Sequence, residues 1–200
     1  MIKAILMDYA GVILQAGQMF DPLNDFCPSL TKEKSRELWK NARVGDISGE
    51  EYMLTYPEKA WDWYFEQTVL HKGVKEFIQT NKLPKYIASN HISILIQKQI
   101  DMLDVRDYFK EIFVSDELKL AKPDKEFFEE ILKRIDLNAD EVIFVDDQKR
   151  NLFTAQELGM KTIWVNNIKE TTFGHNSDMT PDAELYNLSK LNEIISEMIK

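Results

Sequence analysis

The feature that most restricts the fold is a short apolar run near the start of the chain. Residues 2–7 are apolar except for Lys3, the run ends at Asp8, and Gly11 follows closely. An apolar run ended by an acid and then a glycine predicts a buried strand that enters a tight loop. Strands buried on both faces belong to parallel sheets, whose ligands bind beyond the carboxyl ends of the strands. We therefore expect Asp8 at a ligand-binding edge.

Apolar runs alternate with helical patterns from residue 72 onward. Strands are expected at 85–88, 111–114, 141–145 and 162–165, and helices at 72–81, 92–102, 124–135, 149–159 and 188–199. Strands that alternate with helices of this length predict βαβ units and a parallel sheet. Pro123 is expected in the first turn of its helix, and Gly159 just after the last turn of its own. Residues 167–180 are polar and are expected to form a loop.

Residues 15–70 differ from the rest of the chain because they show helical spacing and no run typical of a strand. Helices are expected there at 31–42, 48–56 and 57–70. Ser48 with Glu51 fits a capping box. The sequence thus predicts a doubly wound, Rossmann-like α/β fold. Its parallel sheet is formed by residues 1–14 and 71–200, and a small helical cap is inserted after the first strand.

Composition and charge argue against several classes of function. The formal net charge of −9 disfavours binding to the backbone of a nucleic acid. No window reaches the roughly 18–20 apolar residues of a membrane span, and no signal peptide is recognisable. The single cysteine, Cys27, cannot form an internal disulfide, so a reducing cytoplasm is the expected location. The sequence leaves the oligomeric state undecided.

Polar residues follow the ends of the predicted strands, and parallel strands would bring them to one edge of the sheet. They are Asp8, Ser89, Asn90, Lys122, Asp146, Asp147 and Asn151. Three carboxylates in one cleft repel one another unless a cation is present, and oxygen ligands of this kind suit Mg²⁺. With Mg²⁺, Lys122 and the Ser89 hydroxyl would bind the oxygens of a phosphoryl group. Asp8 would attack phosphorus and form an aspartyl-phosphate.

The same residues stand in four ordered motifs. These are Asp8-Tyr9-Ala10-Gly11-Val12, Ser89-Asn90, Lys122-Pro123 and Val145-Asp146-Asp147-Gln148-Lys149-Arg150-Asn151. In this order they resemble the motifs of the haloacid-dehalogenase-like hydrolase superfamily, and the resemblance covers nearly the whole chain. Gly45-Asp46-Ile47-Ser48 also resembles the cap of the subgroup that includes the epoxide-hydrolase N-terminal phosphatase domain and sugar-1-phosphate phosphatases.

The resemblance implies a Mg²⁺-dependent hydrolase that acts on small-molecule phosphate esters. It assigns Asp8 as the nucleophile and a phosphate-binding set of Ser89, Asn90 and Lys122. It also implies a set of oxygen groups around Mg²⁺: Asp8, the carbonyl of Ala10, Asp147 as the direct ligand of the acidic pair, and Asp146 and Asn151 in support.

Ala10 departs from the family pattern, which has a second Asp here to protonate the leaving oxygen and then activate water. Loss of such general acid–base help costs roughly 10²–10⁴-fold in rate. Several readings stay open. The chain could be a phosphatase for substrates with a good leaving group, such as an anomeric phosphate, or His91 could replace the missing Asp as acid and base if it is not a surface or capping residue. The chain could also cleave phosphonates, although no Schiff-base lysine is identifiable in the cap. Finally, the active site could have decayed.

Two hypotheses about function follow from the residue at position 10. The first is a Mg²⁺-dependent phosphomonoester hydrolase. The second is a catalytically weak protein that binds metal and phosphate or a partner, which Ala10 favours. A dehalogenase is the less favoured third hypothesis, because that chemistry needs no metal and would not use the acidic pair Asp146 and Asp147.

Overall fold

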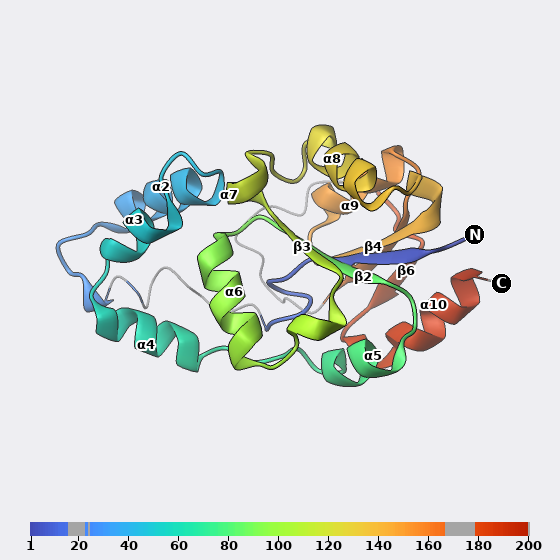
Figure 1. Cartoon of the computed structure of the whole chain (residues 1–200), viewed down its shortest axis with the longest axis horizontal. Helices are drawn as coiled ribbons and strands as arrows, with labels where there is room; N and C mark the ends of the chain where they lie inside the picture. The colour runs from blue at the N-terminus through green and yellow to red at the C-terminus, as the bar shows by residue number, and fades with distance from the viewer. Residues whose placement is uncertain (16–22, 24, 167–178, 200) are drawn as a thin grey trace.

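The computed structural model describes residues 1–15, 23, 25–166 and 179–199. A six-stranded sheet forms its centre (Figure 1). The strands are β1 (Ala4–Met7), β2 (Lys85–Ser89), β3 (Glu111–Val114), β4 (Val142–Asp146), β5 (Lys161–Val165) and β6 (Ala183–Leu185). Their order is β3-β2-β1-β4-β5-β6, and every neighbouring pair is parallel. The predicted doubly wound α/β fold is confirmed, with β6 as a strand that was not predicted.

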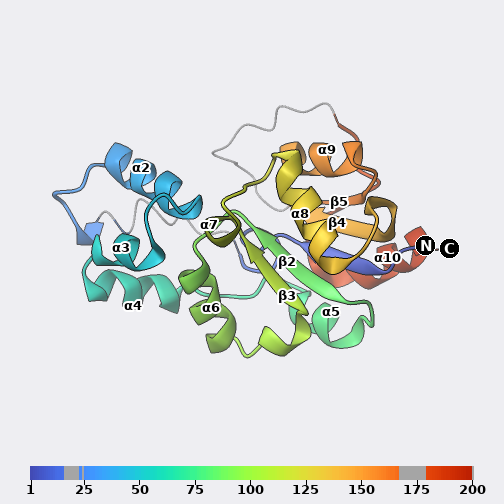
Figure 2. The ribbon, with the colours of Figure 1, turned by 45° about the horizontal axis from the view of Figure 1, so that its top comes forward.

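Helices cover both faces of the sheet (Figures 1 and 2). One face carries α8 (Lys125–Ile135) and α9 (Lys149–Glu157), and the other carries α5 (Val74–Thr80), α6 (Ser93–Met102) and α10 (Leu191–Ile199). Short 3-10 turns link these elements, namely η1 (Arg106–Tyr108), η2 (Ala139–Glu141) and η3 (Leu188–Lys190).

Strand β1 lies in the middle of the sheet and is buried on both faces. Because side chains alternate along a strand, Ile5 and Met7 pack into the core beneath α5, α6 and α10, whereas Ala4 and Leu6 pack into the core beneath α8 and α9. All four side chains have zero solvent exposure. This double burial explains why the run is apolar at consecutive positions rather than at alternate ones.

Three helices lie together beyond the carboxyl end of β1, as both ribbon views show. They are α2 (Lys32–Arg43), α3 (Gly49–Leu54) and α4 (Glu58–Glu66). The predicted capping box of Ser48 and Glu51 is present at the start of α3. The helices enclose an aromatic cluster that contains Tyr52 and Trp61 and also includes Leu95 from α6. The helical cap therefore packs on the core through α6.

The bounds of the cap, residues 15–70, stay a prediction, but the two connecting segments lie side by side. Leu14 forms an antiparallel bridge with Leu70. The Gln15 N–H donates to the Val69 carbonyl at 3.0 Å, and the His71 N–H donates to the Ile13 carbonyl at 2.8 Å. This pairing also explains why α4 ends at Glu66, because the last residues of the predicted helix are extended and paired instead.

Three further details concern the predicted elements. Gly159 has φ +101° just after the end of α9, as predicted for a glycine that follows a helix. Pro123 is not in the first turn of α8 as predicted, because Asp124 is the N-cap and Pro123 precedes it. A one-turn helix, α7 (Ser115–Leu118), follows β3 directly and was not predicted. The predicted loop at 167–180 falls almost entirely outside the described residues.

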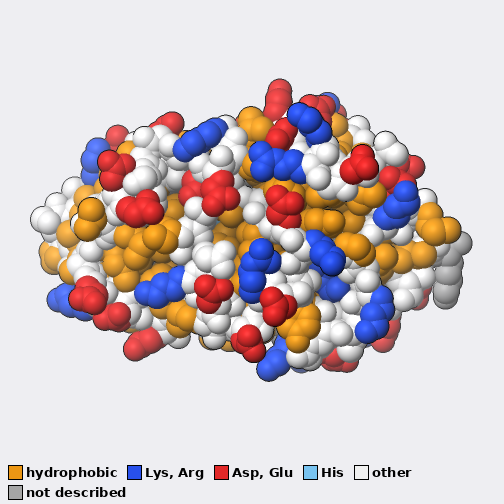
Figure 3. Space-filling model, viewed as in Figure 1, with side chains coloured by type: hydrophobic (Ala, Val, Ile, Leu, Met, Phe, Trp, Pro, Cys, Tyr) orange, Lys and Arg blue, Asp and Glu red, His pale blue; other side chains and the backbone are white. Residues whose placement is uncertain are grey.

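On the face shown in Figure 3, Asp and Glu side chains are interspersed with Lys and Arg side chains, and apolar side chains lie between them. In the described part of the chain, no helix combines the length and the apolar character needed to cross a bilayer. The cytoplasmic location and the lack of a nucleic-acid partner stay predictions.

Candidate functional site

The carboxyl ends of three neighbouring strands bring the predicted site residues together. Asp8 directly follows β1, Ser89 is the last residue of β2, and Asp146 is the last residue of β4. The register pairs Met7 with Ile87 on one side and with Val145 on the other, so these ends are level.

We use the name carboxylate cluster for Asp8, Asp146 and Asp147, which are all buried. One ligand oxygen from each lies within 4.8 Å of the others. Asp8 thus meets the adjacent pair Asp146 and Asp147, which is far from it in the sequence, at one buried point on the sheet edge.

Lys122 supplies the positive charge inside the carboxylate cluster. Its Nζ lies 2.9 Å from Asp8 Oδ1 and 2.8 Å from Asp146 Oδ2, and its side chain is buried. Burial alone would lower the pKa of Lys122, but the charges of Asp146 and Asp8 outweigh it and raise the pKa. Lys122 therefore stays cationic and balances part of the negative charge.

The carboxylate of Asp8 is held in one orientation by hydrogen bonds to a single oxygen. Oδ1 accepts from the Tyr9 N–H at 2.6 Å and from Lys122 Nζ. The Asp8 N–H donates to the Val145 carbonyl at 2.8 Å, which ties the backbone to β4. Burial raises the pKa of Asp8 to about 7 against the lowering effect of Lys122, and Asp146 raises it further. Bound positive charge would favour the ionised, nucleophilic form.

Asp146 is fully engaged by protein donors. Besides Lys122, its oxygens accept from the Gln148 N–H at 2.7 Å and from Asn151 Nδ2 at 3.1 and 3.0 Å. These bonds occupy both oxygens. Asp146 therefore orients Lys122 and Asn151. This is compatible with the expectation that Asp146 and Asn151 support the metal ligands rather than bind the metal directly.

Asp147 differs from Asp146 because one of its buried oxygens lacks a protein donor. Oδ1 has no hydrogen-bond partner within the described ranges. Burial raises the pKa of Asp147 to about 9, and the negative charges of Asp146 and Asp8 raise it further. An orphaned carboxylate oxygen that faces two other acids is a position that a cation would satisfy.

The backbone of Gly11 packs closely against the carboxylate of Asp147. Gly11 has φ +91°, and a Cβ at this residue would lie 2.6 Å from Asp147 Oδ2. Only glycine fits this approach without displacing the carboxylate. The donor set of oxygens, the orphaned Oδ1 and the raised pKa together fit Mg²⁺.

Asn90 contacts the backbone of Lys122 rather than pointing its amide into open space. Its Nδ2 donates to the Lys122 carbonyl at 2.7 Å, and its Oδ1 accepts from the Lys122 N–H at 2.8 Å. Asn90 thus positions Lys122. Both ends of the Asn90 amide are used in these two hydrogen bonds, so the structure supports a positioning role for Asn90 more strongly than the predicted role in phosphate binding. Ser89 is buried at the end of β2, and its contact with phosphate stays a prediction.

Ala10 and His91 decide which groups can move protons. Ala10 is exposed and offers only its backbone carbonyl. His91 is buried and is neither a surface residue nor a helix cap: its ring packs edge-on against Tyr9 and Trp39. Burial lowers the pKa of His91 to about 4, despite a contact of Nδ1 with the Ile92 carbonyl that raises it. The imidazole is therefore neutral at pH 7.

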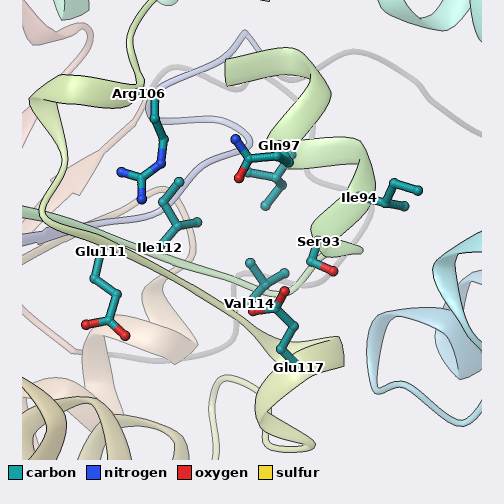
Figure 4. Close-up of a pocket in the computed structure, with 9 residues that line it drawn as sticks. Ser93, Ile94, Gln97, Arg106, Glu111, Ile112, Val114 and Glu117 are labelled. Carbon is teal, nitrogen blue, oxygen red and sulfur yellow. The ribbon is translucent and has the colours of Figure 1, made fainter. Parts of the chain in front are cut away.

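Sequence reasoning missed Ser115, the first residue after β3. Its Oγ accepts the His91 N–H at 3.1 Å and so supports the segment that follows Ser89. The sequence did contain a signal for Ser115, because it is a polar residue that directly follows a predicted strand. The same pattern identified Asp8 and Ser89 as candidate site residues. A groove of about 340 Å³ between α6 and β3 (Figure 4) is a separate feature, since none of the predicted site residues line it.

Comparison with known proteins agrees with this geometry. The family model described as haloacid dehalogenase-like hydrolase matches residues 22–165. A D-ribitol-5-phosphate phosphatase of Bacteroides thetaiotaomicron is 26% identical over 190 residues, covering 81% of this chain and 91% of that protein. A sesquiterpene phosphatase of Aspergillus oryzae is 50% identical over 54 residues, but the match spans only 27% of this chain and 28% of that protein.

Among solved structures, a 2-haloacid dehalogenase of Pseudomonas syringae pv. Tomato DC3000 has a TM-score of 0.73 and 19% identity, covering 99% of this chain and 100% of that one. At this identity the likeness concerns the fold alone. The family match carries the assignment, because it extends over more than half of the chain and includes the segments that hold Ser89, Lys122 and the acidic pair. The chain belongs to the haloacid dehalogenase-like hydrolase family.

Proposed function

We propose that the chain is a Mg²⁺-dependent hydrolase of small phosphate monoesters that works through an aspartyl-phosphate on Asp8. The observation that carries this proposal is the position of Lys122, which bridges Asp8 and Asp146 beside the orphaned oxygen of Asp147. The relatives named as phosphatases support the same reaction class.

Each residue of the site has a role in the proposed reaction. Tyr9 N–H and Lys122 hold Asp8 Oδ1, and Oδ2 is the oxygen that attacks phosphorus. The Lys122 ammonium and the Ser89 hydroxyl orient the phosphoryl oxygens. The new bond joins Asp8 to phosphorus while the bond from phosphorus to the leaving oxygen breaks. Water then displaces Asp8 and releases inorganic phosphate.

The residues that would hold Mg²⁺ are Asp8, Asp147 and the carbonyl of Ala10, with Asp146 and Asn151 supporting them. When bound, Mg²⁺ supplies positive charge for the phosphoryl oxygens and for the carboxylate cluster. The net charge of −9 makes this local charge necessary, because the chain as a whole repels anionic substrates.

The leaving oxygen must gain its proton without help from residue 10. The exposed methyl group of Ala10 transfers no proton, and His91 is neutral at pH 7 because burial lowers its pKa to about 4. A good leaving group, such as an anomeric oxygen, is therefore the substrate feature that fits best. This agrees with the resemblance of the cap to that of sugar-1-phosphate phosphatases. Phosphonate cleavage finds no support, since the lysines on the described helices α2–α4 are exposed.

The experiment that tests the proposal compares Asp8→Asn with the wild type on a panel of phosphate esters with and without Mg²⁺. We expect wild-type turnover that requires Mg²⁺ and is abolished in the variant, while circular dichroism shows an unchanged fold. Asp140→Asn, which changes an exposed acid far from the sheet edge, serves as the matched control and should retain activity. Undiminished turnover by Asp8→Asn would contradict the role of Asp8.

A catalytically weak protein that binds metal and phosphate is the second candidate, and Ala10 is the observation that favours it. The same panel separates the two functions. Background rates for every ester, together with measurable binding of Mg²⁺ and inorganic phosphate by calorimetry, would support the second candidate.

A further inference from the structure

The carboxyl end of α2 meets α7, the single turn that directly follows β3 (Figures 1 and 2). Ser115 Oγ, at the start of α7, donates to the Arg43 carbonyl. Lys119 Nζ, just after α7, donates to the Gly45 carbonyl at 2.6 Å. Arg43 is the last residue of α2, and the last carbonyls of a helix have no partner within it. We use the name docking pair for Ser115 and Lys119, because both hold the cap on the core.

Two glycines allow the backbone of the cap to approach the core closely at this place. Gly45 has φ +75°, and a Cβ at this residue would collide with Lys119 Nζ and with the Asp116 carbonyl. Gly49 is the first residue of α3, and a Cβ there would lie 2.7 Å from Cγ2 of Ile94 in α6. The junction between α2 and α3 therefore lies directly on α7 and α6.

The docking pair stands on a fixed part of the core. Asp116, the second residue of α7, accepts from the Ser93 N–H at 2.8 Å and from Ser93 Oγ at 2.9 Å, both through Oδ2. Ser93 is the first residue of α6. Because these two bonds tie α7 to α6, a cap that leaves the docking pair moves relative to both helices.

Ser115 is also linked to the candidate site. Its Oγ accepts from the His91 N–H at 3.1 Å, and His91 is two residues after Ser89. A hydroxyl group has only one proton to donate. The Arg43 carbonyl receives this proton when the cap is docked, and the His91 carbonyl, 3.4 Å away, is a second acceptor within reach. The position of α2 thus decides the direction of the hydroxyl that supports the segment after Ser89.

We propose that Ser115 transmits docking of the cap to the segment after Ser89, and that Lys119 sets the fraction of molecules in which the cap is docked. This inference rests on the proposed function, in which Ser89 orients the phosphoryl group. An ester then meets a complete site only in the docked fraction, so its apparent affinity falls with that fraction. Ser115 and Lys119 are positioning residues, because they act on backbone groups rather than on the substrate.

The test uses Lys119→Met, which keeps the length of the side chain but removes the donor. Lys119 is exposed, so this variant should fold. Lys119→Arg keeps a cationic donor and is the conservative variant. Lys110→Met is the matched control, because Lys110 is an exposed lysine at the other end of β3. The readouts are steady-state kinetics with the best ester of the panel, and the exchange rate of the His91 N–H followed by NMR.

We expect Lys119→Met to raise KM about 3- to 20-fold while kcat stays within about twofold, because saturating substrate restores the docked cap. The His91 N–H should exchange faster by a similar factor, although Lys119 bonds to Gly45 and not to His91. Lys119→Arg and Lys110→Met should behave like the wild type. An unchanged KM or an unchanged exchange rate in Lys119→Met would overturn the inference.

Ser115→Ala tests the transmission itself, with thermal unfolding as the check that this buried substitution leaves a folded protein. In the Ser115→Ala background, adding Lys119→Met should leave the exchange rate of the His91 N–H unchanged, because the linking hydroxyl is gone. Additive effects would overturn the role of Ser115, since Trp39 of α2, whose ring lies 4.9 Å from that of His91, would then carry the signal. Failure of the proposed function has a different signature: the wild type would turn over no ester, while hydrogen exchange still tests the docking pair.

Discussion

The side chain of Asn90 holds the backbone of Lys122 at two points, donating to its carbonyl at 2.7 Å and accepting from its N–H at 2.8 Å. These two residues are 32 positions apart in the sequence, and the bonds join the end of β2 to the segment before α8. The Lys122 ammonium, which touches Asp8 and Asp146, is therefore placed by an amide that contacts neither of those acids.

Asn90→Ala should lower kcat by about 10- to 100-fold, because catalysis by a positioned charge falls steeply when the charge is displaced by even 1 Å. The measurement is steady-state kinetics with the best ester found in the panel. Asn138→Ala removes another structural amide, in the capping box before β4, and should affect stability but not kcat. An unchanged kcat in Asn90→Ala would show that Lys122 needs no such support.

Gly11→Ala should weaken Mg²⁺ binding as well as the fold. Gly11 and Gly159 both have positive φ, so alanine at either costs roughly 1–2 kcal/mol of backbone strain. Only at Gly11 would the new Cβ collide with a carboxylate, 2.6 Å from Asp147 Oδ2, whereas the Cβ at Gly159 meets its nearest neighbour at 3.9 Å. Gly159→Ala is thus the matched control. Calorimetric Mg²⁺ titration should show reduced affinity for Gly11→Ala alone, and equal affinities would argue against crowding at Asp147.

The metal-free protein should lose stability as the pH rises from 7 to 9. Burial, with the charges of Asp146 and Asp8, raises the pKa of Asp147 to about 9 in the native state, against about 4 in the unfolded chain. In this window the native state keeps a proton that the unfolded state has released, so stability falls by up to about 1.4 kcal/mol per pH unit. The buried His91, with its pKa lowered to about 4, has the opposite effect: its contribution is complete above about pH 6.5 and is lost only at lower pH.

Thermal unfolding between pH 7 and 9 measures this slope, with a chelator and with excess Mg²⁺. Bound Mg²⁺ replaces the proton on Asp147, so the slope should flatten when the metal is added. Asp147→Asn should flatten it without metal. A slope that is the same in Asp147→Asn and in the wild type would place the titrating group elsewhere.

The ends of the central strands were predictable from the sequence because the pattern that marks them lies within a few consecutive residues. β1 and β4 are buried on both faces, so each appears as an apolar run that stops at an acid, and parallel pairing then fixes the edge where Asp8 and Asp146 meet. The sequence could not show what Asn90 does, because both of its bonds are made to a segment 32 residues away.

Short elements were missed for a related reason. β6 has three residues and forms because its backbone pairs with β5, not because of a strong pattern of its own. α7 is a single turn whose Asp116 accepts from both the N–H and the Oγ of Ser93. Tertiary hydrogen bonds decide such segments, and local propensity carries little information about them.

Ala10→Asp should raise the rate most for esters with poor leaving groups. Ala10 is exposed, so a carboxyl group has room at this position. If chemistry is limited by the missing proton donor, turnover of an alkyl phosphate should rise by roughly 10²–10⁴-fold, whereas an aryl phosphate, whose leaving oxygen needs little protonation, should gain far less. The readout is the ratio of kcat/KM for the two ester types.

Ala10→Asn separates proton transfer from hydrogen bonding in the same experiment. It has nearly the shape of Asp but no carboxyl proton, so it should leave both esters near the wild-type rate. A gain in both variants would point to hydrogen bonding or substrate placement. No gain in Ala10→Asp for either ester would argue against a chemical step that is limited by the lack of a general acid at residue 10.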